Sequence, residues 1–279
     1  MPTSSTPTAV VNPFVHTLQI PMSMTLPEID SALRQLRLSG VRATLETRVL
    51  EAQSANLSVL ETISTLLQDE LDLRQSRLLQ RRFTLSGLDE RLTLADFDWN
   101  YNPEIPKRAC FELNALKFIT EGDSALFCGP PGTGKSHVAK AIAYAAVRAG
   151  LRVHYAEADE LLAQLQLAAD SSLGRHRFLK PVLDADLLVL DDLFLHRNII
   201  GPSADDLQMI LHRRYKRRAS VLITTNRVVD DWHVCLGDTA LATAILDRLL
   251  HRSVLVKFQG RSYRLKEATA RLVNVTSAA

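Results

Sequence analysis

Residues 129–136 form a glycine-rich segment whose residue types and spacing suit it to bind phosphate. The segment reads Gly-Pro-Pro-Gly-Thr-Gly-Lys-Ser and matches the pattern GxxxxGK[ST] at every fixed position. Glycines allow backbone N–H groups to turn inward around phosphate oxygens, and a helix that begins near Gly134 points its positive end at the same charge. In this pattern the lysine, here Lys135, reaches the β- and γ-phosphates, and the serine hydroxyl, here of Ser136, binds Mg²⁺. The predicted contacts to a nucleotide are Gly129, Pro130, Pro131, Gly132, Thr133, Gly134, Lys135, Ser136 and His137.

Two carboxylates follow a continuous apolar run further along the chain. Residues 187–190 read Leu-Leu-Val-Leu, and Asp191 and Asp192 come directly after them. In P-loop proteins an aspartate at such a position holds Mg²⁺, and we assign that role to Asp191. Asp192 is then placed to polarise the attacking water. Glutamate is commoner there, so the shorter side chain is expected to slow hydrolysis. The alternative is that the pair only caps the following turn.

A third apolar run ends in polar residues. Residues 220–226 read Ser-Val-Leu-Ile-Thr-Thr-Asn. A polar side chain at the end of a strand beside the phosphate loop can hydrogen-bond the γ-phosphate or the attacking water. Asn226 is the first candidate and Thr225 the second. Asn also commonly follows strands for reasons of turn chemistry alone, which is the alternative interpretation.

Alternating strands and helices are expected to position these residues. Apolar runs predict strands near 124–129, 151–156, 187–191, 219–224 and 253–257, separated by helical stretches. Such alternation predicts a parallel sheet with helices on both faces. Ligands of parallel sheets bind at the carboxyl ends of the strands, so the polar strand ends are expected to converge on the phosphate loop.

The chain before this region is predicted to hold a separate all-helical domain. The capping-box patterns Thr25-Leu-Pro-Glu28 and Ser58-Val-Leu-Glu61 open two helical stretches. Further on, Phe97 and Trp99 could cover an adenine or pin a linker to the core, and pinning is favoured. The predicted organisation is a flexible arm (1–24), an N-terminal helical domain (25–83), a linker (84–106), an ATPase core (107–270) and a tail (271–279).

Composition excludes several classes of protein. Apolar residues make up 46% of the 279 residues, which is enough for a core, and the net charge is +2. No run of 18 apolar residues and no secretory pattern occurs, so we expect no membrane partner. The three cysteines form no CxxC pair, which argues against a disulfide framework or a zinc site. A cytoplasmic location is expected.

The three motifs, in this order, resemble those of AAA+ ATPases. Further matching segments are Asp231-Trp-His233, Leu236-Gly-Asp238, Ala242, Ala244-Ile-Leu-Asp-Arg-Leu249 and Gly260-Arg-Ser-Tyr-Arg264. Together they are similar to the IstB group, the ATP-binding helper proteins of IS21-type insertion sequences, to which the helicase loader DnaC is closely related. Residues 33–40 and 57–61 resemble the front domain of that group. The resemblance therefore covers about residues 29–270.

The resemblance implies a fold, cofactors and partners. The fold is an α/β AAA+ parallel sheet without a C-terminal helical lid. The implied cofactors are ATP and Mg²⁺. The implied partners are duplex DNA, bound largely without sequence preference and deformed, an IstA-like transposase that is recruited and stimulated, and further copies of the chain with ATP between subunits. A bacterial, nucleoid-associated location would follow.

The same resemblance implies that an arginine from a neighbouring subunit contacts the γ-phosphate. Arg248 occupies the matching position, and Arg252, one helical turn on, is the alternative. A desolvated triphosphate favours such a cation, which arrives only when the next subunit docks. The competing interpretation is a surface arginine in a salt bridge with Asp247.

A dense basic run, residues 212–218, is predicted to lie at a helix end just before a strand. Such a run could bind DNA phosphates without reading bases. The predicted contacts are Arg213, Arg214, Lys216, Arg217 and Arg218. Basic residues at a helix C-terminus also complement its dipole, so the run could be structural instead. Two other basic regions comprise Arg74, Arg77, Arg81 and Arg82, and Arg252, Lys257, Arg261, Arg264 and Lys266.

The motifs leave other functions open. A helicase loader of the DnaC type would use ATP in the same way, although the front domain resembles the transposition helper more. A DNA scaffold stabilised by ATP with negligible hydrolysis is compatible with Asp192 in place of glutamate. A small-molecule kinase would need an arginine-rich lid after the third strand, and none is seen in the sequence.

Overall fold

The computed structural model describes residues 24–169, 171–195, 198–266 and 268–269. Contacts between residues divide the chain into two units, Met1–Ser76 and Arg77–Ala279. The predicted arm lies outside the described residues except for Met24, and the predicted tail, 271–279, lies wholly outside them. None of the described helices combines the length and the apolar character that a membrane crossing needs.

The first unit is built from α1 (Leu26–Gln35), α2 (Ser39–Ala55) and most of α3 (Val59–Ser86). Both predicted capping boxes are present. The backbone N–H groups of Thr25 and Ser58 donate to Glu28 (2.7 Å) and Glu61 (2.8 Å), respectively. These bonds satisfy N–H groups that a helix start leaves without partners. One apolar stripe of α3 stays exposed rather than packed: Leu60, Ile63, Leu67 and Leu71.

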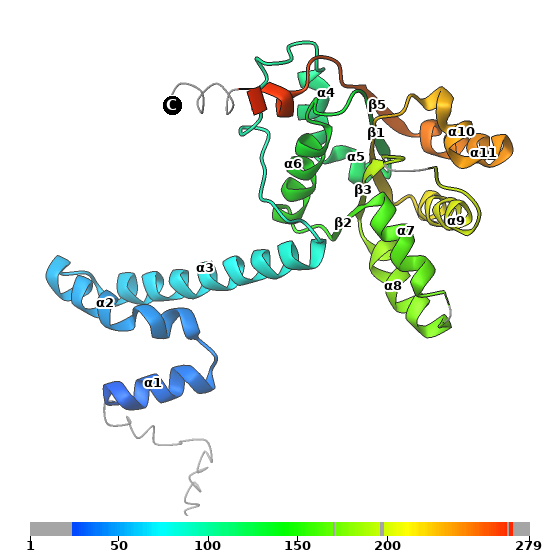
Figure 1. Cartoon of the computed structure of the whole chain (residues 1–279). Coiled ribbons are helices and arrows are strands. Elements are labelled where there is room, and N and C mark those ends of the chain that lie inside the picture. Colours follow the sequence, from blue (N-terminus) through cyan, green and yellow to red (C-terminus); the bar gives the residue numbers. More distant parts are fainter. Residues whose placement is uncertain (1–23, 170, 196–197, 267, 270–279) are drawn as a thin grey trace, which may run out of the picture. The chain divides into compact units, whose positions relative to one another are not determined.

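The second unit is centred on a five-stranded parallel sheet with strand order β2-β3-β4-β1-β5 (Figure 1). The strands are β1 (Ser124–Cys128), β2 (Val153–Glu157), β3 (Leu187–Leu193), β4 (Ser220–Thr225) and β5 (Ser253–Lys257). All five predicted strands and the parallel arrangement are confirmed. Because β4 lies between β1 and β3, the phosphate loop after β1 meets the polar ends of β3 and β4 at one edge of the sheet.

Helices cover both faces of this sheet (Figure 1). Successive strand residues point to opposite faces, so Leu188 and Leu190 enter one apolar cluster while Leu187 and Val189 enter the other. The first cluster draws on α7 to α11 and the second on α4 and α6. The helices are α4 (Lys107–Asn114), α5 (Lys117–Glu121), α6 (Lys135–Arg148), α7 (Ala158–Leu167), α8 (Ser172–Asp184), α9 (Pro202–Arg217), α10 (Trp232–Leu236) and α11 (Thr239–His251).

Residues 87–106, most of the predicted linker, pack on the same face as α6. Leu88, Leu94 and Ile105 are buried in the second cluster. The indole N–H of Trp99 donates to the carbonyl oxygen of Leu94 (3.0 Å) and its ring packs against the cluster, so Trp99 pins this segment as predicted. Phe97 also packs there, and it reaches the cavity described next.

Candidate nucleotide-binding site

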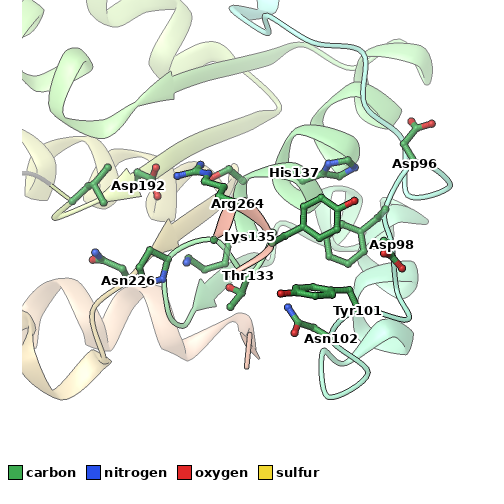
Figure 2. A pocket seen from close by; sticks show the side chains of 17 residues that line it. Asp96, Asp98, Tyr101, Asn102, Thr133, Lys135, His137, Asp192, Asn226 and Arg264 are labelled. Atoms are coloured by element: carbon green, nitrogen blue, oxygen red, sulfur yellow. The ribbon is translucent and has the colours of Figure 1, made fainter. Parts of the chain in front are cut away.

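A cavity of about 400 Å³ lies at the carboxyl end of the sheet. Three groups of residues line it. They are the phosphate loop with the start of α6, the end of β3 with the segments after β3 and β4, and two segments distant in sequence, 96–102 and 263–264. Figure 2 shows Lys135, Asp192, Asn226 and Arg264 near one another, with Tyr101 and Asn102 on the other side of the loop. The lining residues from the loop and the strand ends are Pro131, Gly132, Thr133, Gly134, Lys135, Ser136, His137, Asp192, Leu195 and Asn226.

Lys135 is the central cation of the loop. Its side chain is buried, and its ammonium donates to the carbonyl oxygens of Gly129 (2.9 Å) and Pro130 (2.8 Å). Burial lowers the pKa of Lys135, whereas the charges of Asp192 and Asp191 act in the opposite direction. Gly129 and Pro130 thus serve the loop through their carbonyl groups, and the remaining predicted contacts line the cavity itself.

Gly132 and Gly134, at the centre of the loop, have positive φ and lie very close to other parts of the chain, which a side chain would prevent. Both have positive φ, +77° at Gly132 and +96° at Gly134. A Cβ atom at Gly134 would lie 2.3 Å from the ring of Phe97, and one at Gly132 would lie 2.1 Å from the hydroxyl of Ser262. The segments around Phe97 and Ser262 therefore lie directly against the loop, which only glycine allows at these positions.

A bulge at the end of β3 separates the roles of the two aspartates. The pairing of β3 with β4 shifts register between Leu190 and Leu193, and Asp192 has a φ of +51°. The Asp192 N–H donates to the hydroxyl of Thr224 (2.8 Å). Because of this bend Asp192 lines the cavity, consistent with its predicted role beside the attacking water.

Asp191 lies behind Asp192 and is buried, with 3% of its surface exposed. One carboxylate oxygen accepts a hydrogen bond from the hydroxyl of Tyr155 (2.7 Å), and the other accepts one from the hydroxyl of Thr224. Burial, together with the charge of Asp191, raises the pKa of Tyr155, so the phenol stays protonated and donates. Asp191 does not line the cavity, but each of its oxygens keeps one lone pair.

The two polar residues at the end of β4 point in different directions. The hydroxyl of Thr225 donates to the carbonyl oxygen of Leu193 (2.8 Å) and is fully buried. Asn226 lines the cavity, and its side-chain oxygen is buried without a hydrogen-bond partner among the described residues. Buried polar atoms are normally paired, so this side chain is available to a ligand or a water in the cavity.

Sequence reasoning missed part of the cavity wall. Tyr101, Tyr263 and Arg264 line it, and the rings of Tyr101 and Tyr263 meet edge to face at 5.3 Å. The segment Gly-Arg-Ser-Tyr-Arg at 260–264 did carry a signal, but its arginines were grouped with a basic surface region. Tyr101 gave no signal because no local pattern links it to the phosphate loop.

Cys128 and His137, beside the site, are packing residues rather than reactive groups. Burial raises the pKa of Cys128 to about 11, so its thiol stays protonated at neutral pH. The ring of His137 meets that of Phe97 edge to face at 5.3 Å, and its Nε2 atom lies 3.4 Å from the carbonyl oxygen of Thr93. The cavity therefore combines the glycine-rich loop with carboxylates, amides and aromatic rings.

Comparison with known proteins identifies the family of the chain. The family model of IstB-like ATP binding proteins matches residues 31–270. The chain belongs to this family. It is 33% identical over 253 residues to an insertion-sequence ATP-binding protein of Mycobacterium tuberculosis, covering 90% of this chain and 99% of that protein. It is 35% identical over 241 residues to an ATP-binding protein of insertion sequence IS21 from Pseudomonas aeruginosa, covering 86% and 89%.

Solved structures share the fold of this IstB-like chain. AMPPCP-bound DnaA from Aquifex aeolicus superimposes with a TM-score of 0.52 at 20% identity, covering 67% of this chain and 56% of that one. DnaI superimposes with a TM-score of 0.51 at 20% identity, covering 62% and 90%. At these identities the similarity establishes the AAA+-like fold alone.

The two arginines considered for action across subunits lie outside the cavity of their own chain. In this IstB-like chain Arg252 is held by Asp123 (3.0 Å) and by the carbonyl oxygen of Glu121 (3.1 Å). Among the described residues, Arg248 donates within its own helix, to the carbonyl oxygen of Ala244. The described residues contain no ion pair between Arg248 and Asp247. The guanidinium of Arg252 is therefore held by an ion pair and a carbonyl oxygen, whereas that of Arg248 has one hydrogen bond to a carbonyl oxygen of its own helix.

The basic run of the IstB-like chain lies, as predicted, at the end of α9 just before β4. The structure corrects one of its predicted DNA contacts. Arg214 is fully buried and donates to the carbonyl oxygens of Val182, Ala185 and Ser220, so it cannot contact DNA. The other predicted contacts are exposed: Arg213, Lys216, Arg217 and Arg218.

Proposed function

We propose that this IstB-like chain is an Mg²⁺-dependent ATPase that assists DNA transposition. In this proposal ATP binding controls the assembly of copies on duplex DNA, which is deformed, and the assembly recruits an IstA-like transposase. The observation that carries the proposal is the cavity, where the phosphate loop, Asp192 and Asn226 meet at one edge of the sheet. The names of the relatives, which are ATP-binding proteins of insertion sequences, support the transposition context.

The residues of the cavity suit ATP hydrolysis. Lys135 would exchange the carbonyl oxygens of Gly129 and Pro130 for phosphate oxygens, because a desolvated ammonium binds an anion more strongly than a dipole. Asp192 would orient and polarise the attacking water. Asn226 would accept a hydrogen bond from that water at its unpartnered side-chain oxygen, or donate an amide N–H to the γ-phosphate. Mg²⁺, when bound, would neutralise part of the charge of the triphosphate.

The donor set fits a magnesium ion. Ser136 offers a hydroxyl in the cavity, and Asp191 offers the second lone pair of each carboxylate oxygen. Mg²⁺ usually keeps several of its waters, so a buried carboxylate can act on it through them. We therefore keep Ser136 and Asp191 as the residues that would hold the ion.

The proposed assembly on DNA rests on three other surfaces. Arg248 lies outside its own cavity, as a residue that acts on the neighbouring subunit's ATP must. Arg213, Lys216 and Arg218 are exposed cations that suit contacts to DNA phosphates without sequence preference. The exposed apolar stripe of α3 supports assigning a protein contact to the N-terminal unit, residues 25–83 in the predicted organisation.

ATPase measurements test the proposal. We expect the wild-type chain to hydrolyse ATP slowly and faster with duplex DNA. Asp192→Asn should retain ATP binding and lose turnover, whereas Lys135→Ala should lose ATP binding by about ten- to a hundredfold. Lys140→Ala is the matched control, because Lys140 lies on the same helix and pairs with Asp89 instead.

Two results would change the proposal. If the wild-type chain bound ATP and assembled on DNA with no measurable turnover, the result would favour a DNA scaffold that ATP stabilises. The short side chain of Asp192 is compatible with that function. A chain that loads a helicase and leaves a transposase unaffected would favour the DnaC-type loader. ATP binding by Lys135→Ala at wild-type affinity would contradict the site itself.

A further inference from the structure

The segment that follows β5 lies across the phosphate loop. The N–H of Tyr263 donates to the carbonyl oxygen of Gly132 (2.9 Å), and the N–H of Phe258 donates to that of Cys128 (2.7 Å). These two bonds hold residues 258–263 against the start and the centre of the loop. A segment fixed in this way adds a wall to the cavity that neither the loop nor the sheet supplies.

The same segment is joined to residues 98–102. Asn102 donates to the carbonyl oxygen of Arg261 and accepts from its N–H, both at 2.9 Å. The hydroxyl of Tyr101 donates to the carbonyl oxygen of Ser262 (3.1 Å). We name the two joined segments, 98–102 and 258–266, the clasp. Asn102 uses both of its polar groups in the clasp, so it is a structural member of the cavity wall.

Residues 258–266 of the clasp include three cationic side chains, those of Arg261, Arg264 and Lys266. Arg261 and Lys266 contact the other segment of the clasp. The guanidinium of Arg261 lies 5.5 Å from the ring centre of Tyr101. The ammonium of Lys266 lies 4.5 Å from the same ring and pairs with Asp98 (3.3 Å). Neither lines the cavity.

The third cation, Arg264, is placed differently. It lines the cavity together with Lys135, Asp192 and Asn226 (Figure 2), and it forms none of the ion pairs found among the described residues. Burial lowers the pKa of Lys135, and the nearby charge of Arg264 adds to this lowering. Two cations that face one cavity repel each other, and an anion bound between them would remove that cost.

We propose that Arg264 is a phosphate ligand in the nucleotide site of its own chain and contacts the γ-phosphate of ATP. The inference rests on the proposed ATP site. A guanidinium matches phosphate oxygens with two parallel hydrogen bonds. The γ-phosphate is the one concerned, because Arg264 shares the cavity with Asp192 and Asn226, which stand where the attacking water would lie. The clasp thus supplies a cation over the triphosphate in a chain for which no helical lid is expected.

Comparing ATP with ADP tests this role. Isothermal titration of the full-length protein with Mg·ATP and with Mg·ADP gives both affinities for the wild type and for Arg264→Ala. We expect Arg264→Ala to weaken ATP binding about tenfold or more and ADP binding much less. Arg264→Lys should fall between the two, because it keeps the charge and loses the paired donors. Lys266→Ala and Arg261→Ala are the controls, since each removes one cation of the clasp outside the cavity.

The outcomes separate this inference from the function on which it rests. Equal losses of ATP and ADP affinity in Arg264→Ala, or no loss of either, would overturn the contact to the γ-phosphate while leaving the ATP site intact. No ATP binding by the wild-type chain would overturn both. If Arg264→Ala does not fold, as judged by thermal unfolding without nucleotide, the ratio of ATP to ADP affinity in Arg264→Lys decides in its place: an unchanged ratio refutes the contact.

Discussion

Tyr155 illustrates how one hydroxyl can control a carboxylate that never reaches the cavity surface. It donates to Asp191, which is buried, and Thr224 donates to the other oxygen of the same carboxylate. The hydroxyl of Thr224 also accepts from the N–H of Asp192, so Thr224 links the buried aspartate to the one that lines the cavity. The orientation of Asp191 therefore depends in part on Tyr155, a side chain outside the recognised motifs.

We predict that Tyr155→Phe destabilises the chain and weakens its response to magnesium. Loss of the hydroxyl leaves one oxygen of a buried carboxylate without its donor, which costs about 1–3 kcal/mol. If Asp191 acts on Mg²⁺, half-maximal ATPase activity should also need more of the ion. Chemical denaturation and magnesium titrations of the ATPase rate measure the two effects.

Tyr144→Phe is the matched control, because the Tyr144 ring packs edge to face on Phe83 and the substitution removes the same single atom. Its unfolding free energy should stay within about 0.5 kcal/mol of the wild type. If Tyr155→Phe behaved like this control in both measurements, the positioning role of Tyr155 would be wrong.

Individual residues were only partly predictable from the sequence. The motif spacing predicted that the loop, Asp192 and Asn226 would meet, because parallel strands end at one edge. Which of two adjacent polar residues faces the cavity depends on a register shift after Leu190, which an uninterrupted apolar run does not reveal. Nor does the sequence reveal that the hydroxyl of Thr225 donates to the carbonyl oxygen of Leu193 and so does not face the cavity.

At the scale of elements, α9 combines a structural cation with exposed ones. Arg214 follows Leu207, Ile210 and Leu211 at helical spacing, so it continues the buried stripe of the helix. Three carbonyl oxygens from the end of α8 and from β4 surround its guanidinium. Burial lowers the pKa of Arg214 to about 10, which still leaves it charged at neutral pH. The helical period was the signal that could have distinguished Arg214 from its basic neighbours.

We predict that substitutions of two adjacent arginines of α9 affect different properties, stability for Arg214 and DNA binding for Arg213. Arg214→Met should lower the unfolding free energy by about 3 kcal/mol or more, because three buried carbonyl groups lose their donor. Arg213→Ala should change it by about 0.5 kcal/mol at most, because Arg213 is exposed. Arg213→Ala should instead weaken duplex DNA binding and reduce the salt dependence of log K by about one phosphate contact.

Denaturation curves and DNA titrations at several salt concentrations distinguish the two arginines. Stability unaffected by Arg214→Met would contradict the structural role. DNA affinity unaffected by Arg213→Ala would move the DNA contact to another of the basic regions.

At the scale of the whole molecule, each nucleotide site is proposed to need two copies of the chain. In this proposal the copy that holds ATP would contribute Lys135 and Asp192, and its neighbour would contribute Arg248. Neither Arg248 nor Arg252 lines the cavity of its own chain, and Arg252 is bonded to Asp123. These positions favour Arg248 as the residue that acts across the interface.

We predict that two inactive variants restore activity when mixed. Asp192→Asn and Arg248→Ala should each bind ATP and hydrolyse it poorly. In a mixed assembly, a site formed by Asp192 of one copy and Arg248 of the other is intact, so part of the ATPase rate should return. Steady-state ATPase assays across mixing ratios measure it. Failure to recover, with Arg252→Ala recovering in the same assay, would transfer the role to Arg252.

The overall architecture was easier to predict than the walls of the site. The apolar runs located all five strands, and the signal is strongest for the central strands β1, β3 and β4, which are buried on both faces. The clasp could not be predicted in this way, since Asn102 and Arg261 are 159 positions apart and neither belongs to a repeating pattern. Contacts of this kind depend on how the finished sheet brings distant segments together.

The reciprocal pairing of Asn102 with the Arg261 peptide means that the end of the described chain is built into the nucleotide cavity. Cutting the protein short just after the last strand would remove no residue of the phosphate loop or of the polar strand ends. It would nevertheless remove the hydrogen bond from Tyr263 to Gly132 and the contact between the rings of Tyr101 and Tyr263. A C-terminal deletion should therefore weaken ATP binding.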